Sequence, residues 1–143
     1  MTRAVLACFF LCTWNLVTEA QEADAMTMPL AAAGDPAIGR AIFSDRESGH
    51  CVLCHQVDGL EVPFQGNLGP ALSDVGARLT EAQIRLRIVD NTKVNPGTVM
   101  PSYYRTTDLH QVGRAYQGET VLSAAEVEHL VAWLSQLRGR KND

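Results

Sequence analysis

The sequence predicts a small all-α domain. Three segments each begin at a residue suited to cap a helix and continue with apolar residues at helical spacing. The long stretches between them are rich in glycine, proline and asparagine, and none alternates apolar and polar residues for long enough to predict a strand. A Cys-x-x-Cys-His motif occurs once, between the first two segments. These features favour a few short helices and long loops arranged around one bound group.

The start of the chain has the features of an export signal. Arg3 is followed by an apolar run over residues 4–17 and then by the small residue Ala20. The run is too short to span a bilayer comfortably, and a basic start, an apolar run and a small residue are typical of a secretory signal peptide. We therefore expect residues 1–20 to be a signal peptide, cleaved after Ala20 or Ala23, and the mature protein to be periplasmic.

The mature chain is expected to contain a leader and one domain. Residues 21–34 are Ala-rich and have no apolar stripe of useful length, which predicts a flexible leader or a docking arm. Residues 35–143 are enough for one domain with one core. The net charge is −4, and no basic cluster or alternation of aromatic and basic residues is present. Nucleic acid is therefore excluded as a partner.

The first helix of the domain is predicted to start at Asp35. Asp35 is a good N-cap and Pro36 suits the first helical position. Gly39 lies within this helix, where a glycine costs about 1 kcal/mol relative to alanine. Its presence suggests that another backbone comes close. The apolar side of the helix consists of Ile38, Ala41, Ile42 and Phe43.

Two further helices are predicted from capping boxes. Thr80 and Gln83 form the first box, and the helix runs to Asp90. Ser123 and Glu126 form the second. The last helix has the clearest apolar stripe and is predicted to close at Arg138 and Gly139, with Val127, Leu130, Val131, Leu134 and Leu137 at helical spacing. Long loops are predicted over 56–76 and 91–122.

The Cys51-x-x-Cys54-His55 motif has three interpretations: a redox dithiol, half of a zinc site, or the attachment site of a c-type haem. Zinc needs four ligands, and no second cysteine pair or spaced histidine pair follows. A thioredoxin-like dithiol normally follows a strand, whereas a helix and a loop are predicted before Cys51. The haem interpretation uses every residue, because two thiols bind the two vinyl groups and His55 ligates the iron. We expect one covalent haem c.

Met100 is the expected sixth ligand of the iron, opposite His55. It lies in a loop bounded by glycine and proline that is long enough to cross the far side of a haem. The alternatives are a methionine that only packs in the core, and His110 as the ligand. An occupied sixth position indicates electron transfer rather than chemistry at the iron. Less suitable candidates are Met26 and Met28 in the leader, His50 beside Cys51, and His129 on a polar, solvated helix face.

The order of these features resembles the class I cytochromes c, through "CVLCH", "NLGPALSDVGARL", "VMPSYY" and "LSAAEVEHLVAWLSQL". The resemblance implies a helical domain wrapped around one covalently attached haem. It implies that the first and last helices cross near Gly39, Phe43 and Trp133. It also implies that the Pro70 carbonyl accepts a hydrogen bond from the ring N–H of His55. The implied haem-binding residues are Cys51, Cys54, His55, Met100 and Pro70, with His55 and Met100 on the iron.

Residues 66–137 are similar to the SoxX family, the mono-haem subunits of the SoxAX sulfur-oxidation cytochromes, notably in "NPGTVMPSYYRT". The resemblance implies an electron-transfer subunit with no catalytic residue of its own, in a heterodimer that couples thiosulfate to a carrier-protein cysteine. The implied partners are a SoxA-like dihaem cytochrome subunit, a SoxYZ-like carrier and a small soluble cytochrome c acceptor. The alternatives are a freely diffusing electron shuttle and an enzyme or gas sensor with open iron. Tyr103, Tyr104 and Arg105 are expected to pack around the ligand loop.

Overall fold

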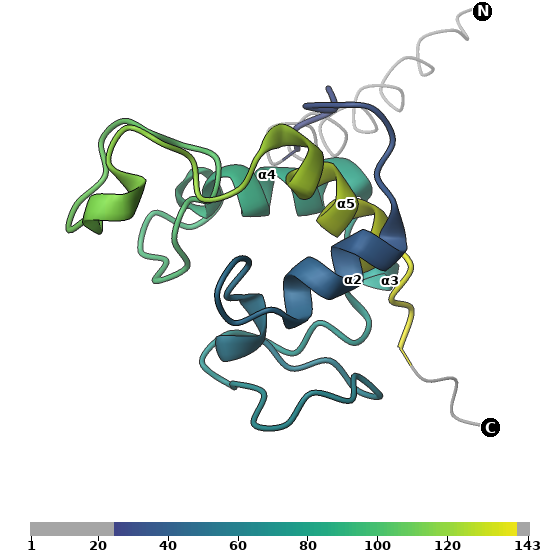
Figure 1. The fold of residues 1–143 in the computed structure, drawn as a ribbon. Coiled ribbons are helices and arrows are strands. Elements are labelled where there is room, and N and C mark those ends of the chain that lie inside the picture. Colours follow the sequence, from purple (N-terminus) through teal and green to yellow (C-terminus); the bar gives the residue numbers. More distant parts are fainter. Residues whose placement is uncertain (1–24, 140–143) are drawn as a thin grey trace, which may run out of the picture.

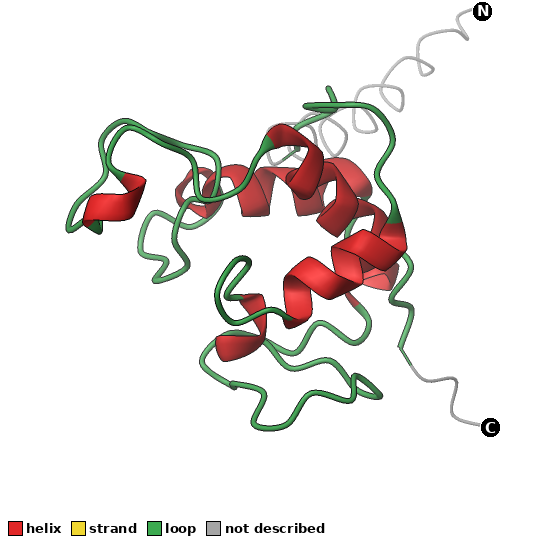
Figure 2. Cartoon of the chain, in the orientation of Figure 1, coloured by secondary structure: helices red, strands yellow, loops and turns green. Residues whose placement is uncertain are grey.

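A computed structural model describes residues 25–139 of the 143-residue chain (Figure 1). The expected signal peptide therefore lies outside the described residues. Four α-helices and three short 3-10 helices follow in order: α2 (Pro36–Ser44), η1 (Cys51–Leu53), α3 (Val75–Arg78), α4 (Glu81–Asp90), η2 (Asn91–Lys93), η3 (Arg114–Tyr116) and α5 (Ala124–Leu134). Within the described chain there is no strand, which confirms the all-α prediction (Figure 2). No described helix is long and apolar enough to cross a membrane.

The three predicted helices begin at their predicted caps. The Asp35 side chain accepts hydrogen bonds from the N–H groups of the first turn of α2, and Thr80 and Ser123 each complete a capping box. The sequence did not predict α3, which is only four residues long. The helix α5 ends at Leu134, whereas the sequence predicted an end near Arg138. The chain beyond Leu134 turns towards α3, where the Gly76 N–H donates a hydrogen bond to the Leu137 carbonyl (2.8 Å).

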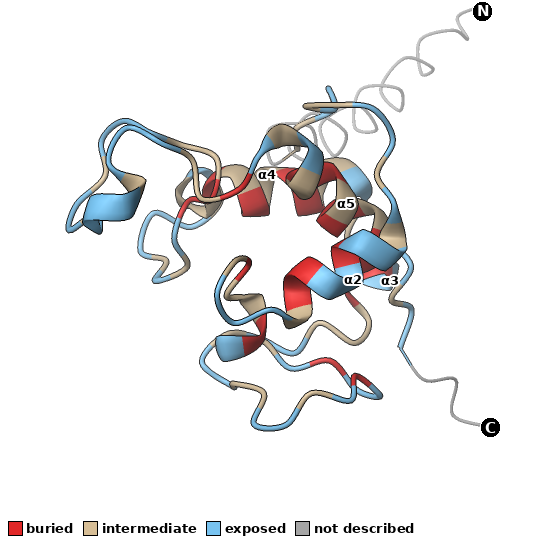
Figure 3. Cartoon of the chain, in the orientation of Figure 1, coloured by how far each residue is buried: buried red, intermediate tan, exposed pale blue. Residues whose placement is uncertain are grey.

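The core forms where α2 crosses α5 and α4 packs beside α5 (Figure 1). The rings of Phe43 and Trp133 are 4.9 Å apart between centroids and tilted by 55°, an arrangement that aromatic pairs favour. At Gly39 the two helices are so close that a Cβ atom would overlap the backbone carbonyl of His129. The close approach predicted from this glycine is therefore present. Figure 3 shows the buried parts of these helices turned inwards. The almost fully buried side chains are Phe43 in α2, Val127, Leu130 and Val131 in α5, and Val52 and Leu122 outside these helices.

The described part of the leader, residues 25–34, lies against α4 and α5. Arg85 and Glu128, each only 4% exposed, form a salt bridge with two hydrogen bonds, at N···O distances of 2.7 and 2.8 Å. Arg85 also donates to the Met26 carbonyl (2.8 Å), and Glu128 accepts from the Leu30 N–H (3.0 Å). The described end of the predicted leader is thus joined to α4 and α5.

His129, which was predicted to be solvated, makes a hydrogen bond that the sequence did not reveal. Its ring is half-buried and its Nδ1 accepts a hydrogen bond from the Asp35 N–H (2.7 Å). A ring nitrogen that accepts a hydrogen bond at this distance is the unprotonated nitrogen of the imidazole. The polar side of α5 therefore binds the chain just before α2, through the bond from Asp35 to His129, in addition to contacting water.

Replacing Glu128 by glutamine is expected to lower the free energy of unfolding by about 3 kcal/mol at pH 7, because Arg85 would remain buried without its counter-ion. Burial raises the pKa of Glu128, but the hydrogen bonds from Arg85 and Leu30 and the Arg85 charge outweigh burial, so that the pKa lies below the ordinary 4.5. The stabilisation from Glu128 is thus complete above about pH 4.5 and is lost as the pH falls through the lowered pKa of the folded state.

Urea unfolding of the haem-loaded protein at several pH values is the measurement. The difference between wild type and Glu128→Gln should shrink below about pH 4.5. Glu119→Gln, at an exposed position, is the matched control and should be near neutral. Equal effects of the two substitutions at pH 7 would contradict the stabilising role of the buried pair.

Candidate functional site

The Cys-x-x-Cys-His motif forms one tight turn. His50 has a left-handed backbone (φ 56°) and precedes η1, where Cys54 N–H and His55 N–H both donate to the Cys51 carbonyl, at 3.1 and 2.8 Å. Residues three and four positions apart on such a turn lie on one side of it. Both cysteines are free thiols and half-buried. The turn therefore brings together two thiols and one imidazole.

The imidazole of His55 is held by the loop that follows the motif. Its Nδ1 lies 2.8 Å from the Pro70 carbonyl, which can only accept, so Nδ1 carries the proton and Nε2 has a free lone pair that could bind a metal. A Cβ atom at Gly69 would overlap the ring, so the backbone lies directly against it. The carbonyl thus fixes the orientation and the tautomer of the ring, as second partners of metal-binding histidines do.

Gln65 holds the first long loop in place, a role for which the sequence carries no signal. Its side-chain amide donates to the carbonyls of Val57 and Leu60 (3.3 and 3.0 Å), and its oxygen accepts from the Val57 N–H (2.8 Å). The next residue, Gly66, donates to Val52 O (2.9 Å). One side chain therefore closes the turn at 57–60 and places the loop beside η1.

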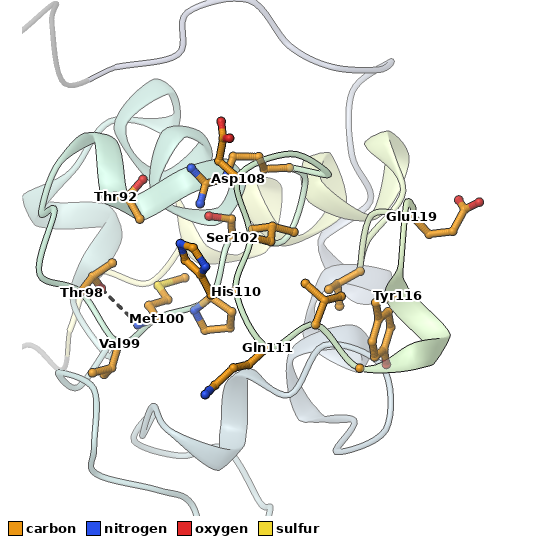
Figure 4. A pocket seen from close by; sticks show the side chains of 16 residues that line it. Thr92, Thr98, Val99, Met100, Ser102, Asp108, His110, Gln111, Tyr116 and Glu119 are labelled. Atoms are coloured by element: carbon orange, nitrogen blue, oxygen red, sulfur yellow. Dashed lines mark hydrogen bonds between the residues drawn. The ribbon is translucent and has the colours of Figure 1, made fainter.

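Met100 lies in the second long loop and lines a cavity of about 390 Å³. His110 lines the same cavity, and Figure 4 shows both side chains in one view. The cavity thus contains the preferred sixth ligand and its predicted alternative. Met28 is 76% exposed, and Met26 is held through its backbone at α4, so neither leader methionine lines the cavity.

The motif and the Met100 loop border the same core. Cys51 and Met100 both pack against it. Tyr103 belongs to the same core, and burial raises the pKa of its hydroxyl. Tyr103 is buried and Tyr104 packs against the core, in agreement with the packing role expected of them.

The residues present fit a covalently attached haem. Burial is the main cause that raises the pKa of the Cys51 thiol to about 12, whereas a redox dithiol depends on a lowered pKa. Among residues 25–139, no three His, Cys, Asp or Glu side chains form a group that could hold a metal ion by themselves. Two thiols on one turn, an oriented imidazole and a thioether at the same core match the donors that a c-type haem uses.

Comparisons with known proteins point the same way. Residues 36–138 match the family model described as Cytochrome c. The chain is similar to the crystal structure of SoxXA from P. pantotrophus, with a TM-score of 0.74 and 32% identity, covering 81% of this chain and 91% of that one. It is also similar to the c-type cytochrome SorU from Sinorhizobium meliloti, with a TM-score of 0.47 and 22% identity, covering 73% and 91% of the two chains. No protein of curated function matches the sequence significantly.

Proposed function

Because this chain belongs to the cytochrome c family and is SoxX-like, as its motifs predicted, we propose that it is the electron-transfer subunit of a SoxAX-type complex. It carries one covalently attached c-type haem. The observation that best supports the assignment is the 2.8 Å hydrogen bond between His55 Nδ1 and the Pro70 carbonyl, combined with Met100 at the same core. A fixed histidine and a thioether are the ligands of an electron-transfer site.

Each residue of the site has a defined task in this proposal. The thiols of Cys51 and Cys54 form the two thioether bonds, and His55 offers Nε2 to the iron while Pro70 orients its ring. The Met100 thioether would be the second protein ligand of the iron. Haem c, when bound, accepts and donates one electron at its iron. With His55 and Met100 both holding the iron, no site would be left for a substrate, so the chain would relay electrons without transforming a sulfur compound.

The partners in this proposal come from the likeness to SoxXA. A SoxA-like dihaem subunit would carry out the coupling of thiosulfate to a cysteine of a SoxYZ-like carrier. This chain would take up the electrons and pass them to a small soluble cytochrome c. All of this would take place in the periplasm, after removal of the signal peptide.

The test compares the purified haem-loaded subunit with its complex. Thiosulfate, a SoxYZ-like carrier and an oxidised soluble cytochrome c are supplied to the subunit alone, to a SoxA-like partner alone and to both together. We expect reduction of the acceptor only with both. Turnover by the lone subunit would contradict the relay role. A freely diffusing electron shuttle would be favoured if the partner alone reduced the acceptor fully. It would also be favoured if a partner that binds this subunit did not increase reduction of the acceptor.

A further inference from the structure

Residues 98–105, called here the Met100 segment, are attached to the end of α4 on both sides of the methionine. On the preceding side, the Met100 N–H donates to Thr98 Oγ1 (3.1 Å), which also accepts from Asn91 Nδ2 (2.8 Å). On the following side, the N–H groups of Tyr103 and Tyr104 donate to carbonyls of the last turn of α4, at 3.1 and 3.3 Å. Carbonyls in the last turn of a helix have no partner within it, so they are available for such contacts.

A buried carboxylate completes the attachment on the following side. Asp90, the last residue of α4, is 4% exposed, and its Oδ1 accepts a hydrogen bond from the buried Ser102 hydroxyl at 2.8 Å. The same oxygen accepts from the Thr92 hydroxyl (2.6 Å) and the Thr92 N–H (3.2 Å). Of these partners, Ser102 alone belongs to the Met100 segment, two positions beyond the methionine.

Arg105 supplies the opposite charge with imperfect geometry. Its Nη1 lies 3.3 Å from Asp90 Oδ2, and its buried Nε has no hydrogen-bond partner in the structure. A single long contact carries less of the interaction than a paired guanidinium–carboxylate geometry would. The shorter bond from Ser102 is therefore the main side-chain connection between this carboxylate and the Met100 segment.

We propose that Asp90 and Ser102 are positioning residues that keep the Met100 thioether on the iron by fixing its segment to the end of α4. The inference rests on the proposed role of Met100 as the sixth ligand. An external ligand binds only when the thioether leaves, so the attachment sets how often the position opens. A hydrogen bond to a buried charged group of this kind is strong enough to change such an opening equilibrium by about 10- to 100-fold.

The test measures how fast cyanide binds to the oxidised haem-loaded protein. Ser102→Ala removes the bond on the Met100 side and should raise the rate about 10- to 100-fold, while the near-infrared sulfur-to-iron band of the resting protein remains. Thr92→Val is the matched control, because it removes a hydroxyl bond to the same oxygen from outside the Met100 segment. It should leave the rate within about threefold of wild type. Urea unfolding of both variants separates a general loss of stability from this local effect.

Three results distinguish the possibilities. A faster rate in Ser102→Ala alone, with the band retained and the two variants similarly stable, would support the positioning role. Equal cyanide-binding rates in Ser102→Ala and Thr92→Val would overturn it, because the Asp90 carboxylate would then have no specific effect on Met100. Absence of the band from the wild-type protein would show that Met100 is not the ligand, which overturns the proposed ligation and this inference with it.

Discussion

Gly39→Ala is expected to lower the free energy of unfolding by about 3 kcal/mol or more, the upper end of the range for overpacking a core. The added Cβ would overlap the His129 carbonyl and come within 3.0 Å of the Trp133 Cβ. The main obstacle is backbone, which cannot move aside as a flexible side chain does. The helices α2 and α5 would have to separate, and the Phe43–Trp133 contact at 4.9 Å would weaken with them.

Urea unfolding of the haem-loaded protein, followed by tryptophan fluorescence and circular dichroism, gives the size of this effect. Gly113→Ala is the matched control, because its Cβ would meet only a Tyr116 ring carbon at 3.8 Å and its φ is −58°. This control should change the free energy of unfolding by less than about 1 kcal/mol. A Gly39→Ala protein as stable as the control would contradict the close crossing of the two helices.

Met100→Ala is expected to abolish the near-infrared sulfur-to-iron band of the oxidised protein. It should also lower the reduction potential, because a methionine ligand raises the potential of haem iron. Cyanide should bind at least about 100-fold faster, since the local opening that normally precedes binding, of a few kcal/mol, would no longer be needed. Absorption spectra, a redox titration and stopped-flow mixing with cyanide measure the three effects.

Two other variants make this prediction specific. Met28→Ala, at a residue 76% exposed, should change none of the three quantities. His110→Ala tests the other candidate in the cavity and should leave the band in place. A band that survives in Met100→Ala and disappears in His110→Ala would assign a different ligand set from the one proposed.

The features predicted correctly from the sequence depend on short-range chemistry. The caps at Asp35, Thr80 and Ser123 involve residues two or three positions apart, so their patterns are visible in the chain. Gly39 was informative because a glycine inside a helix has a cost that needs an explanation. The Cys-x-x-Cys-His motif is equally local, since all its reactive groups lie on one turn.

The features that could not be predicted depend on partners far apart in the chain. Glu128 lies beside His129 and, as a charged residue, looks like an exposed helix residue, but its partner Arg85 is 43 positions away. Asp90 was predicted only as a helix end, yet it binds Ser102 twelve positions later. Gln65 lies in a stretch of turn residues where nothing distinguishes a fixed loop from a mobile one. In each case a buried or half-buried polar side chain is explained only by the partner that the fold supplies.

The crossing of α2 and α5 also constrains the order in which the protein can fold. Phe43 and Trp133 are 90 positions apart (133 − 43), so their contact closes a loop that contains nearly the whole domain. Contacts of such long sequence separation are slow to form, because chain entropy is lost before the contact compensates for it. The Cys-x-x-Cys-His segment precedes α5 in the chain and is therefore synthesised before it. The two thiols of the motif are thus present in the chain before the helix whose docking on α2 closes the domain.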